Sequence, residues 1–240
     1  MKKSDLTKRP KETALDVAHT VVKAALGSVP VVGSAASELF AAIVTPPIVR
    51  RKDEWVESIA LGLERLRAGE GLNFDELSRN DAFISTVLHA TQAALRSHQQ
   101  EKLDALRNAV LNSARPGAPD DDLQLVFLNL VDTFAPWHLR VLAFLDDPRS
   151  WLDSRDVRYH HLMMGGVSTV LELAFPELVS RRDFYDQLAK DLHVRGLLST
   201  ESLHVTVTAD GMVASRTTEM GKTFLKFISE PPAPDRMSER

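Results

Sequence analysis

The sequence predicts a mainly α-helical protein with one β-hairpin near its C-terminus. Apolar residues recur at helical spacing through residues 50–67, 81–95 and 103–111. Alternation typical of a strand is found at residues 203–207. Asp210-Gly211 follows, a pair that favours a tight hairpin turn. Together these patterns predict helices for the body of the chain and a single two-stranded ribbon after them.

Composition fits a folded protein and excludes several kinds of chemistry. Of 240 residues, 44% are hydrophobic and 26% charged, which is ordinary globular usage. The chain has no cysteine, so disulfides, thiolate zinc sites and cysteine nucleophiles are excluded. A net charge of -4 gives no overall attraction for polyanions. The first apolar run follows Lys11, Glu12 and Asp16, which argues against a signal peptide, and we expect a cytoplasmic protein.

The N-terminal region begins with a basic segment, residues 1–12, that we expect to be a flexible tail. Residues 24–49 follow as an apolar stretch in which Glu38 is the only charge. Gly27, Pro30 and Gly33 interrupt it, so the sequence predicts a hairpin: one helix ends near Leu26 and a second runs from about Ser34 to Val44, stopped by Pro46 and Pro47.

Two interpretations of this apolar hairpin stay open. Its small residues suit close packing against the body of the protein. They equally suit a segment that docks on a partner, forms an oligomer or reaches a membrane surface. In the second case we expect these residues to make the contact: Val31, Val32, Leu39, Phe40 and Ile43.

A helical body is predicted for residues 13–118. Trp55, Ile59, Leu63 and Leu66 form one apolar stripe of an amphipathic helix. Asn80 stands where it would cap the next helix. The loop ARPGAPDDD then predicts a boundary. Asp120, Asp121 and Asp122 in it could attract a divalent cation, but acids at a helix start more often cap free amides.

A second module is predicted for residues 119–229, followed by a disordered, proline-rich tail at 230–240. Helices near 137–145, 162–174 and 183–194 precede the predicted hairpin at 203–216. This order resembles a winged helix-turn-helix. The segment from Thr217 to Leu225, TTEMGKTFL, resembles the threonine-x-x-glycine helix that follows the wing in bacterial winged-helix proteins. The resemblance implies that a threonine hydroxyl caps this helix and that its apolar face packs back.

In winged-helix proteins the third helix contacts DNA, and here it corresponds to residues 181–198. If the module binds nucleic acid, the contacting residues would be Arg181, Arg182, Lys190, Arg195 and Arg216. Residues 131–229 carry 11 basic and 13 acidic side chains, a net charge of -2, which is poor equipment for binding phosphates.

No catalytic residue, metal site, cofactor or small-molecule substrate is predicted. His160 and His161 are adjacent, so on a helix they could not share one ion, and Gly166-Val-Ser168 lacks the closing glycine of a nucleophile elbow. The sequence therefore favours a non-enzymatic protein-interaction or regulatory module that binds a protein partner or forms a homo-oligomer. The alternatives are a membrane-active effector that uses the apolar hairpin and a winged-helix DNA-binding regulator.

The order of parts adds a distant resemblance. A small-residue apolar hairpin, a charged helix that opens Arg50-Arg51-Lys52-Asp53-Glu54-Trp55, a helical body and a threonine-glycine terminal helix look like a family of uncharacterised bacterial helical proteins. They are distantly similar to abortive-infection proteins of the Abi-alpha kind. This resemblance implies a role in bacterial defence, including defence against phage, or in stress, and it transfers no site residue.

Overall fold

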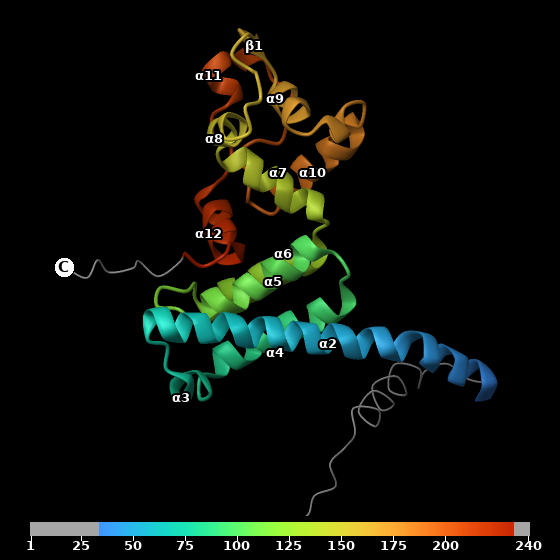
Figure 1. The fold of residues 1–240 in the computed structure, drawn as a ribbon. Coiled ribbons are helices and arrows are strands. Elements are labelled where there is room, and N and C mark those ends of the chain that lie inside the picture. The colour runs from blue at the N-terminus through green and yellow to red at the C-terminus, as the bar shows by residue number, and fades with distance from the viewer. Residues whose placement is uncertain (1–33, 233–240) are drawn as a thin grey trace, which may run out of the picture. The chain divides into compact units, whose positions relative to one another are not determined.

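The computed structural model describes residues 34–232, and the mainly α-helical class is confirmed (Figure 1). The elements are α2 (Ser34–Glu70), α3 (Phe74–Leu77), α4 (Asp81–Arg96), α5 (Gln100–Ser113), α6 (Asp121–Thr133), α7 (Pro136–Asp146), α8 (Pro148–Asp153), β1 (Met164–Gly165), α9 (Val167–Ala174), η1 (Pro176–Leu178), α10 (Arg182–Val194), β2 (Val207–Thr208), α11 (Ala209–Met212) and α12 (Glu219–Ile228). The chain forms two compact units, residues 1–60 and 61–240, and α2 crosses the division. The basic segment 1–12, residues 24–33 of the apolar hairpin and residues 233–240 of the tail lie outside the described residues.

In the first unit, helix α2 corrects one prediction. Pro46 and Pro47 do not stop the helix, which continues through both to Glu70. Proline lacks an amide hydrogen, but its fixed φ is close to the helical value, so a helix can pass through it when neighbouring turns keep their hydrogen bonds. Further along, Trp55 and Ile59 are buried, as the predicted apolar stripe requires.

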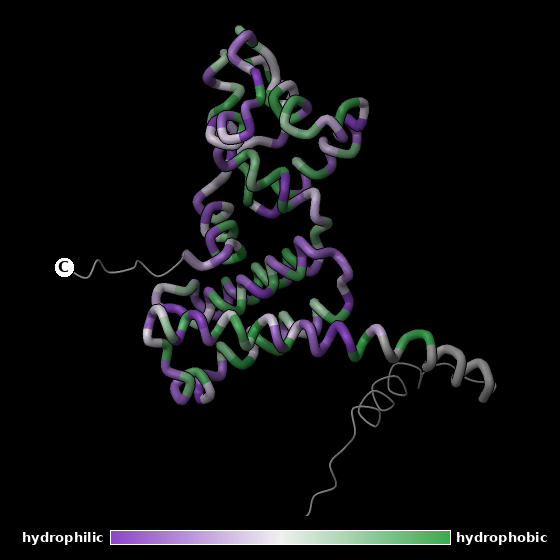
Figure 2. Tube along the Cα trace, viewed as in Figure 1, coloured by the Kyte–Doolittle hydropathy of each residue, from purple (hydrophilic) through white to green (hydrophobic). Residues whose placement is uncertain are grey.

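The second unit contains a layer of helices formed by α4, α5, α6 and α12. Helices α4 and α5 pack as a hairpin, and α6 packs on both. Hydrophobic and hydrophilic residues alternate along these helices, as in amphipathic segments (Figure 2). The predicted caps are confirmed: the side chains of Asn80 and Asp120 accept hydrogen bonds from the backbone amides of Phe83 and Leu123. The loop at 114–120, where we predicted a boundary, therefore lies within one compact unit.

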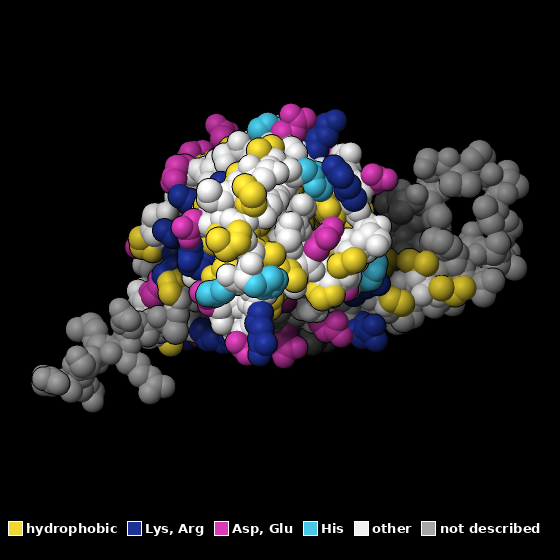
Figure 3. Space-filling view, turned by 90° about the horizontal axis from the view of Figure 1, so that it is seen from above, with side chains coloured by type: hydrophobic (Ala, Val, Ile, Leu, Met, Phe, Trp, Pro, Cys, Tyr) yellow, Lys and Arg dark blue, Asp and Glu magenta, His cyan; other side chains and the backbone are white. Residues whose placement is uncertain are grey.

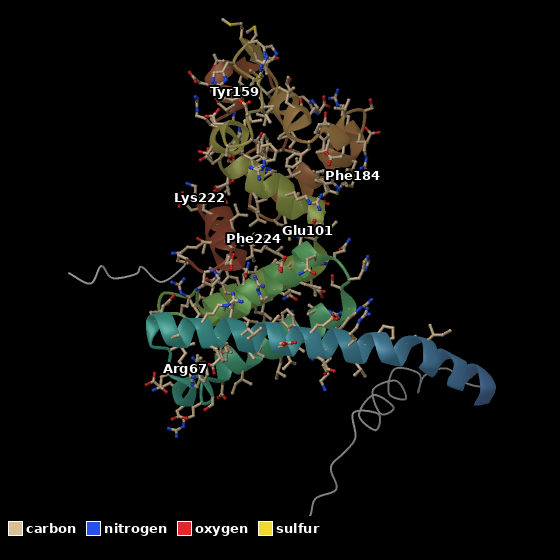
Figure 4. The ribbon with its side chains drawn as sticks, in the orientation of Figure 1. Arg67, Glu101, Tyr159, Phe184, Lys222 and Phe224 are labelled. Carbon is tan, nitrogen blue, oxygen red and sulfur yellow. The ribbon has the colours of Figure 1, made fainter. Side chains whose placement is uncertain are left out.

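Helix α12 closes this layer and also packs against α7. Its Phe224 is fully buried beside Phe127 of α6, with ring centroids 5.3 Å apart (Figure 4). The hydroxyl of Thr218 accepts a hydrogen bond from the amide of Gly221 at 3.0 Å, so the implied threonine cap is confirmed. The apolar residues of α12 are buried on one face, and they fix the end of the chain against α5 and α6.

The other part of this unit has the order strand, helix, helix, strand. β1 precedes α9, η1 and α10, and β2 then pairs with β1 in an antiparallel sheet, with Met164 opposite Thr208 and Gly165 opposite Val207. Helix α10 packs on α7, and Pro136 occupies the first turn of α7 as predicted. The predicted helix at 162–174 begins only at Val167, because the residues before it form β1.

The small antiparallel sheet exists, but its strands differ from the predicted hairpin at 203–216. Asp210 and Gly211 lie in α11, whose start is capped by the Thr208 hydroxyl. Leu203 is buried outside any strand, and its carbonyl accepts a hydrogen bond from the Ser168 amide. The prediction paired the strand with the residues that follow it, whereas its partner precedes it by two helices.

Candidate interaction surfaces

The residues predicted to contact a partner or membrane lie mostly beyond what the structure describes. Val31 and Val32 are outside the described residues, and Leu39 and Phe40 lie in the helical backbone of α2. Ile43 is the one whose side chain can be placed, and it is 64% exposed. In residues 34–232, no helix contains a stretch that is both long and apolar enough to cross a bilayer.

The five basic residues proposed for nucleic-acid contact have different surroundings. Arg181 lies with its guanidinium 4.2 Å from the ring centroid of Phe184. Arg182 forms an ion pair with Asp186 at 3.4 Å. Arg216 lies beyond α10 and donates a hydrogen bond to the carbonyl of Gly211. Three of the five cations therefore already have partners.

Lys190 and Arg195 are exposed, and within the described part of the chain neither forms an ion pair. The most exposed stripe of α10 consists of residues spaced three or four apart: Asp183, Gln187, Lys190 and Val194. This stripe carries one positive and one negative charge. Such a face offers little electrostatic attraction to phosphates.

A buried polar cluster joins α10 to its neighbours. The Tyr185 hydroxyl donates to a carboxylate oxygen of Glu172 at 2.9 Å, and His204 Nε2 lies 2.7 Å from Asp186. Burial, helped by the bond to Glu172, raises the pKa of Tyr185 to about 12. No group of three histidine, aspartate or glutamate side chains in residues 34–232 is arranged to hold a metal. The cluster therefore positions α10, and we assign it no chemistry.

A cavity of about 300 Å³ lies between the N-terminal halves of α4 and α6. Asp81, Asp121 and Asp122 line it together with apolar residues such as Leu125. Below it, the Thr86 hydroxyl donates to Gln124 in a buried hydrogen bond of 3.0 Å. These acids follow helix caps, where negative charge complements the helix dipole, so their position has a structural explanation.

An exposed apolar end lies beside the small sheet. Met163 is 81% exposed, Met164 67% and Val205 62%. Val205 belongs to the same end of the unit, because the Cα atom of the preceding His204 lies close to Gly166, immediately after β1. Hydrophobic side chains and histidines lie together on this end when it is seen from above (Figure 3). We call Met163, Met164 and Val205 the methionine tip.

The methionine tip is held by buried residues on both sides. Tyr159 and Val167 are buried, and the amide of Ala209 donates to the carbonyl of Met163 at 3.1 Å (Figure 4). Burial, with a hydrogen bond to Asp153, raises the pKa of Tyr159, which stays neutral at physiological pH. The segment between these anchors presents its methionines outward from a fixed base.

Sequence reasoning missed the methionine tip. It assigned both methionines to a helix at 162–174, in which part of the segment would be buried. The glycines at 165 and 166 were the available signal, since glycine in a helical pattern often marks a turn or a close backbone approach. A Cβ atom on Gly166 would lie 2.8 Å from the carbonyl oxygen of Leu203, so this position requires glycine.

Comparison of the chain with protein-family models, with curated proteins and with solved structures finds no match.

Proposed function

We propose that this chain is a non-enzymatic helical module that binds another protein through the methionine tip. The observation that carries the proposal is the exposure of Met163 and Met164, 81% and 67%, next to Val205 on one end of a folded unit. Single exposed apolar residues are common, but adjacent ones mark interaction surfaces. The long, flexible methionine side chain adapts to partner surfaces and is frequent at them.

Burial of these side chains would supply a useful part of the binding free energy. Removing one large apolar side chain from water contributes about 1.5–3 kcal/mol. The fixed base around Tyr159 and Val167 limits the conformational entropy lost on binding. A role in a bacterial defence or stress system, with a protein partner or a second copy on the tip, is consistent with the distant resemblance of the sequence.

Site-specific photo-crosslinking tests this function. A benzophenone amino acid is placed at Met164 in the full chain, and at the exposed Arg79 as a matched control, and adducts are identified by mass spectrometry. We expect a defined adduct, with this chain or with one partner, from position 164 only, and its loss when Met163 and Val205 are changed to Lys. A chain that is monomeric by light scattering and gives equal, unspecific adducts from both positions would contradict the proposal.

We propose DNA binding as a second candidate, in which the module acts as a winged-helix-like regulator. The supporting observations are the strand-helix-helix-strand order around α10 and the unpaired Lys190 and Arg195 among the described residues. Fluorescence anisotropy with duplex DNA over a salt series tests it. Binding that weakens steeply with salt and with Lys190→Ala supports this function, and absent or salt-independent binding rules it out.

A further inference from the structure

Four aromatic rings form a continuous row on the second unit, away from the small sheet. In order they are Trp151 of α8, Phe175, Trp137 of α7 and Phe184 of α10. Successive ring centroids are 5.0, 5.6 and 6.4 Å apart. All four side chains are half-buried, so each keeps part of its ring in solvent. Phe184 is marked in Figure 4.

Three arginines stack on this row. The guanidinium carbons of Arg155, Arg140 and Arg181 lie 4.1, 5.1 and 4.2 Å from the ring centroids of Trp151, Trp137 and Phe184. We call these four rings and three arginines the aromatic-arginine row. Stacking fixes a guanidinium while its N–H groups, which lie in its plane, stay available for hydrogen bonds.

The arginines at the two ends of the row have donors to spare. Arg140, in the middle, forms an ion pair with Glu101 of α5. Arg155 donates only to the carbonyl of Trp151 and the hydroxyl of Ser154. Within the described residues, neither Arg155 nor Arg181 forms an ion pair with a carboxylate. The row is thus an apolar strip with one unpaired cation at each end.

The surroundings distinguish the anions that would fit. Asp153, Glu177 and Asp183 each lie within two residues of one of the rings. Their negative charge opposes a polyanion such as a nucleic acid, which needs a continuous positive surface. Two separate carboxylates, one at each end, avoid them. Tryptophan and arginine are also the residues that contribute most to protein-protein binding.

We infer that the aromatic-arginine row is a docking site for a protein segment with apolar side chains between two carboxylates. The three centroid spacings, 5.0, 5.6 and 6.4 Å, correspond to about five residues of extended chain at roughly 3.3 Å per residue. Each terminal guanidinium binds one carboxylate with paired hydrogen bonds, and the rings cover the apolar side chains between them. This inference goes beyond the proposed function, because it uses different residues from the methionine tip.

Peptide selection tests the inference. Random peptides displayed on phage are selected on the immobilised full chain and counter-selected on the double variant Arg155→Ala/Arg181→Ala. We expect enriched peptides to carry two acidic residues separated by a short apolar stretch. A synthetic peptide of the consensus should bind each single variant about tenfold more weakly than the unchanged chain, and Arg79→Ala, an exposed control, should bind it equally well.

Further arms separate the outcomes. Circular dichroism confirms that each variant is folded. Enriched peptides without paired acids, or a consensus peptide that binds the double variant equally well, would overturn the inference. Oligothymidylate that binds the chain more tightly than the peptide, and loses binding in the double variant, would identify a nucleic-acid surface instead. Peptide binding that persists in Met163→Lys/Met164→Lys shows that the row acts independently of the tip, so the two proposals can fail separately.

Discussion

Asn112 of α5 donates a hydrogen bond from Nδ2 to the carbonyl oxygen of Phe227, 2.8 Å away and 115 residues further along the chain. The same nitrogen lies 2.8 Å from the carbonyl oxygen of Ser229, and Asn108 Nδ2 donates to that of Ile228. The last carbonyls of a helix have no partner within it. Two asparagines one turn apart on α5 therefore supply donors for the end of α12.

Replacing Asn112 with alanine should destabilise the second unit by about 1–2 kcal/mol, because several carbonyls lose their donor. Asn112→Asp should cost more, since it sets a negative oxygen against those carbonyls. Urea unfolding measures both. Asn129→Ala, at an exposed position of α6, is the matched control and should be nearly neutral. Equal effects of Asn112→Ala and Asn129→Ala would show that this cap contributes nothing to stability.

The hydroxyl of Thr218 has two roles that a substitution can separate from side-chain volume. It accepts from the Gly221 amide at 3.0 Å and donates to the Gly196 carbonyl at 2.6 Å. Thr218→Ala should cost about 1 kcal/mol of unfolding free energy, whereas Thr218→Ser should retain most of it. Thermal or urea unfolding of the two variants decides this. The explanation by capping fails if serine is as damaging as alanine.

Gly221 should resist substitution although it lies inside a helix. Alanine usually stabilises a helix interior by up to about 1 kcal/mol relative to glycine. Here a Cβ atom would lie 2.3 Å from the carbonyl oxygen of Leu197 and 2.5 Å from Thr217. We expect Gly221→Ala to destabilise the protein by about 1–3 kcal/mol in urea unfolding. Lys222→Ala on the same helix is the control and should change stability little; a stabilising Gly221→Ala would refute the close approach.

Local patterns predicted the parts of the fold that depend on nearby residues. Asn80, Asp120 and Thr218 cap helices because their side chains reach amides three residues ahead, which the sequence displays directly. Strand β2 pairs with β1 across two helices, so no adjacent signal identifies its partner. The turn signal Asp210-Gly211 was outweighed by the Thr208 cap, which starts a helix there instead.

The candidate surfaces were less accessible to sequence reasoning. Trp151, Phe175, Trp137 and Phe184 come from four separate segments, and they form a row only because α7, α8 and α10 pack around Phe144. Each ring alone reads as an ordinary core residue. The basic residues of α10 were visible in the sequence, but the ion pair of Arg182 with Asp186 depends on rotamers that the sequence does not give.

The ion pair between Arg140 and Glu101 links α7 to α5, and its two partners should not contribute equally (Figure 4). Both side chains are partly exposed, so a double-mutant cycle should give a coupling of about 0.2–1 kcal/mol that falls with added salt. Arg140 also stacks on Trp137 at 5.1 Å. Arg140→Ala should therefore cost more than Glu101→Ala, by roughly 0.5 kcal/mol. A larger cost for Glu101→Ala would argue against the stacking contribution.

Tyr185 should make the protein lose stability at alkaline pH. Its pKa is raised from 10.0 to about 12 in the folded protein, first by burial and then by its hydrogen bond to Glu172. Between these two values the unfolded chain has released the phenolic proton and the folded chain still holds it, so unfolding becomes more favourable as pH rises. The contribution of the neutral phenol is complete below pH 10 and is lost by about pH 12. Tyr185→Phe cannot ionise, so the difference in unfolding free energy between it and the unchanged chain should shift in favour of phenylalanine over this window, by on the order of 2 kcal/mol. Urea titrations at pH values below and within the window measure that difference, and other alkaline effects cancel because both proteins share them. A difference that stays constant with pH would show that Tyr185 ionises as readily in the folded chain as in the unfolded one.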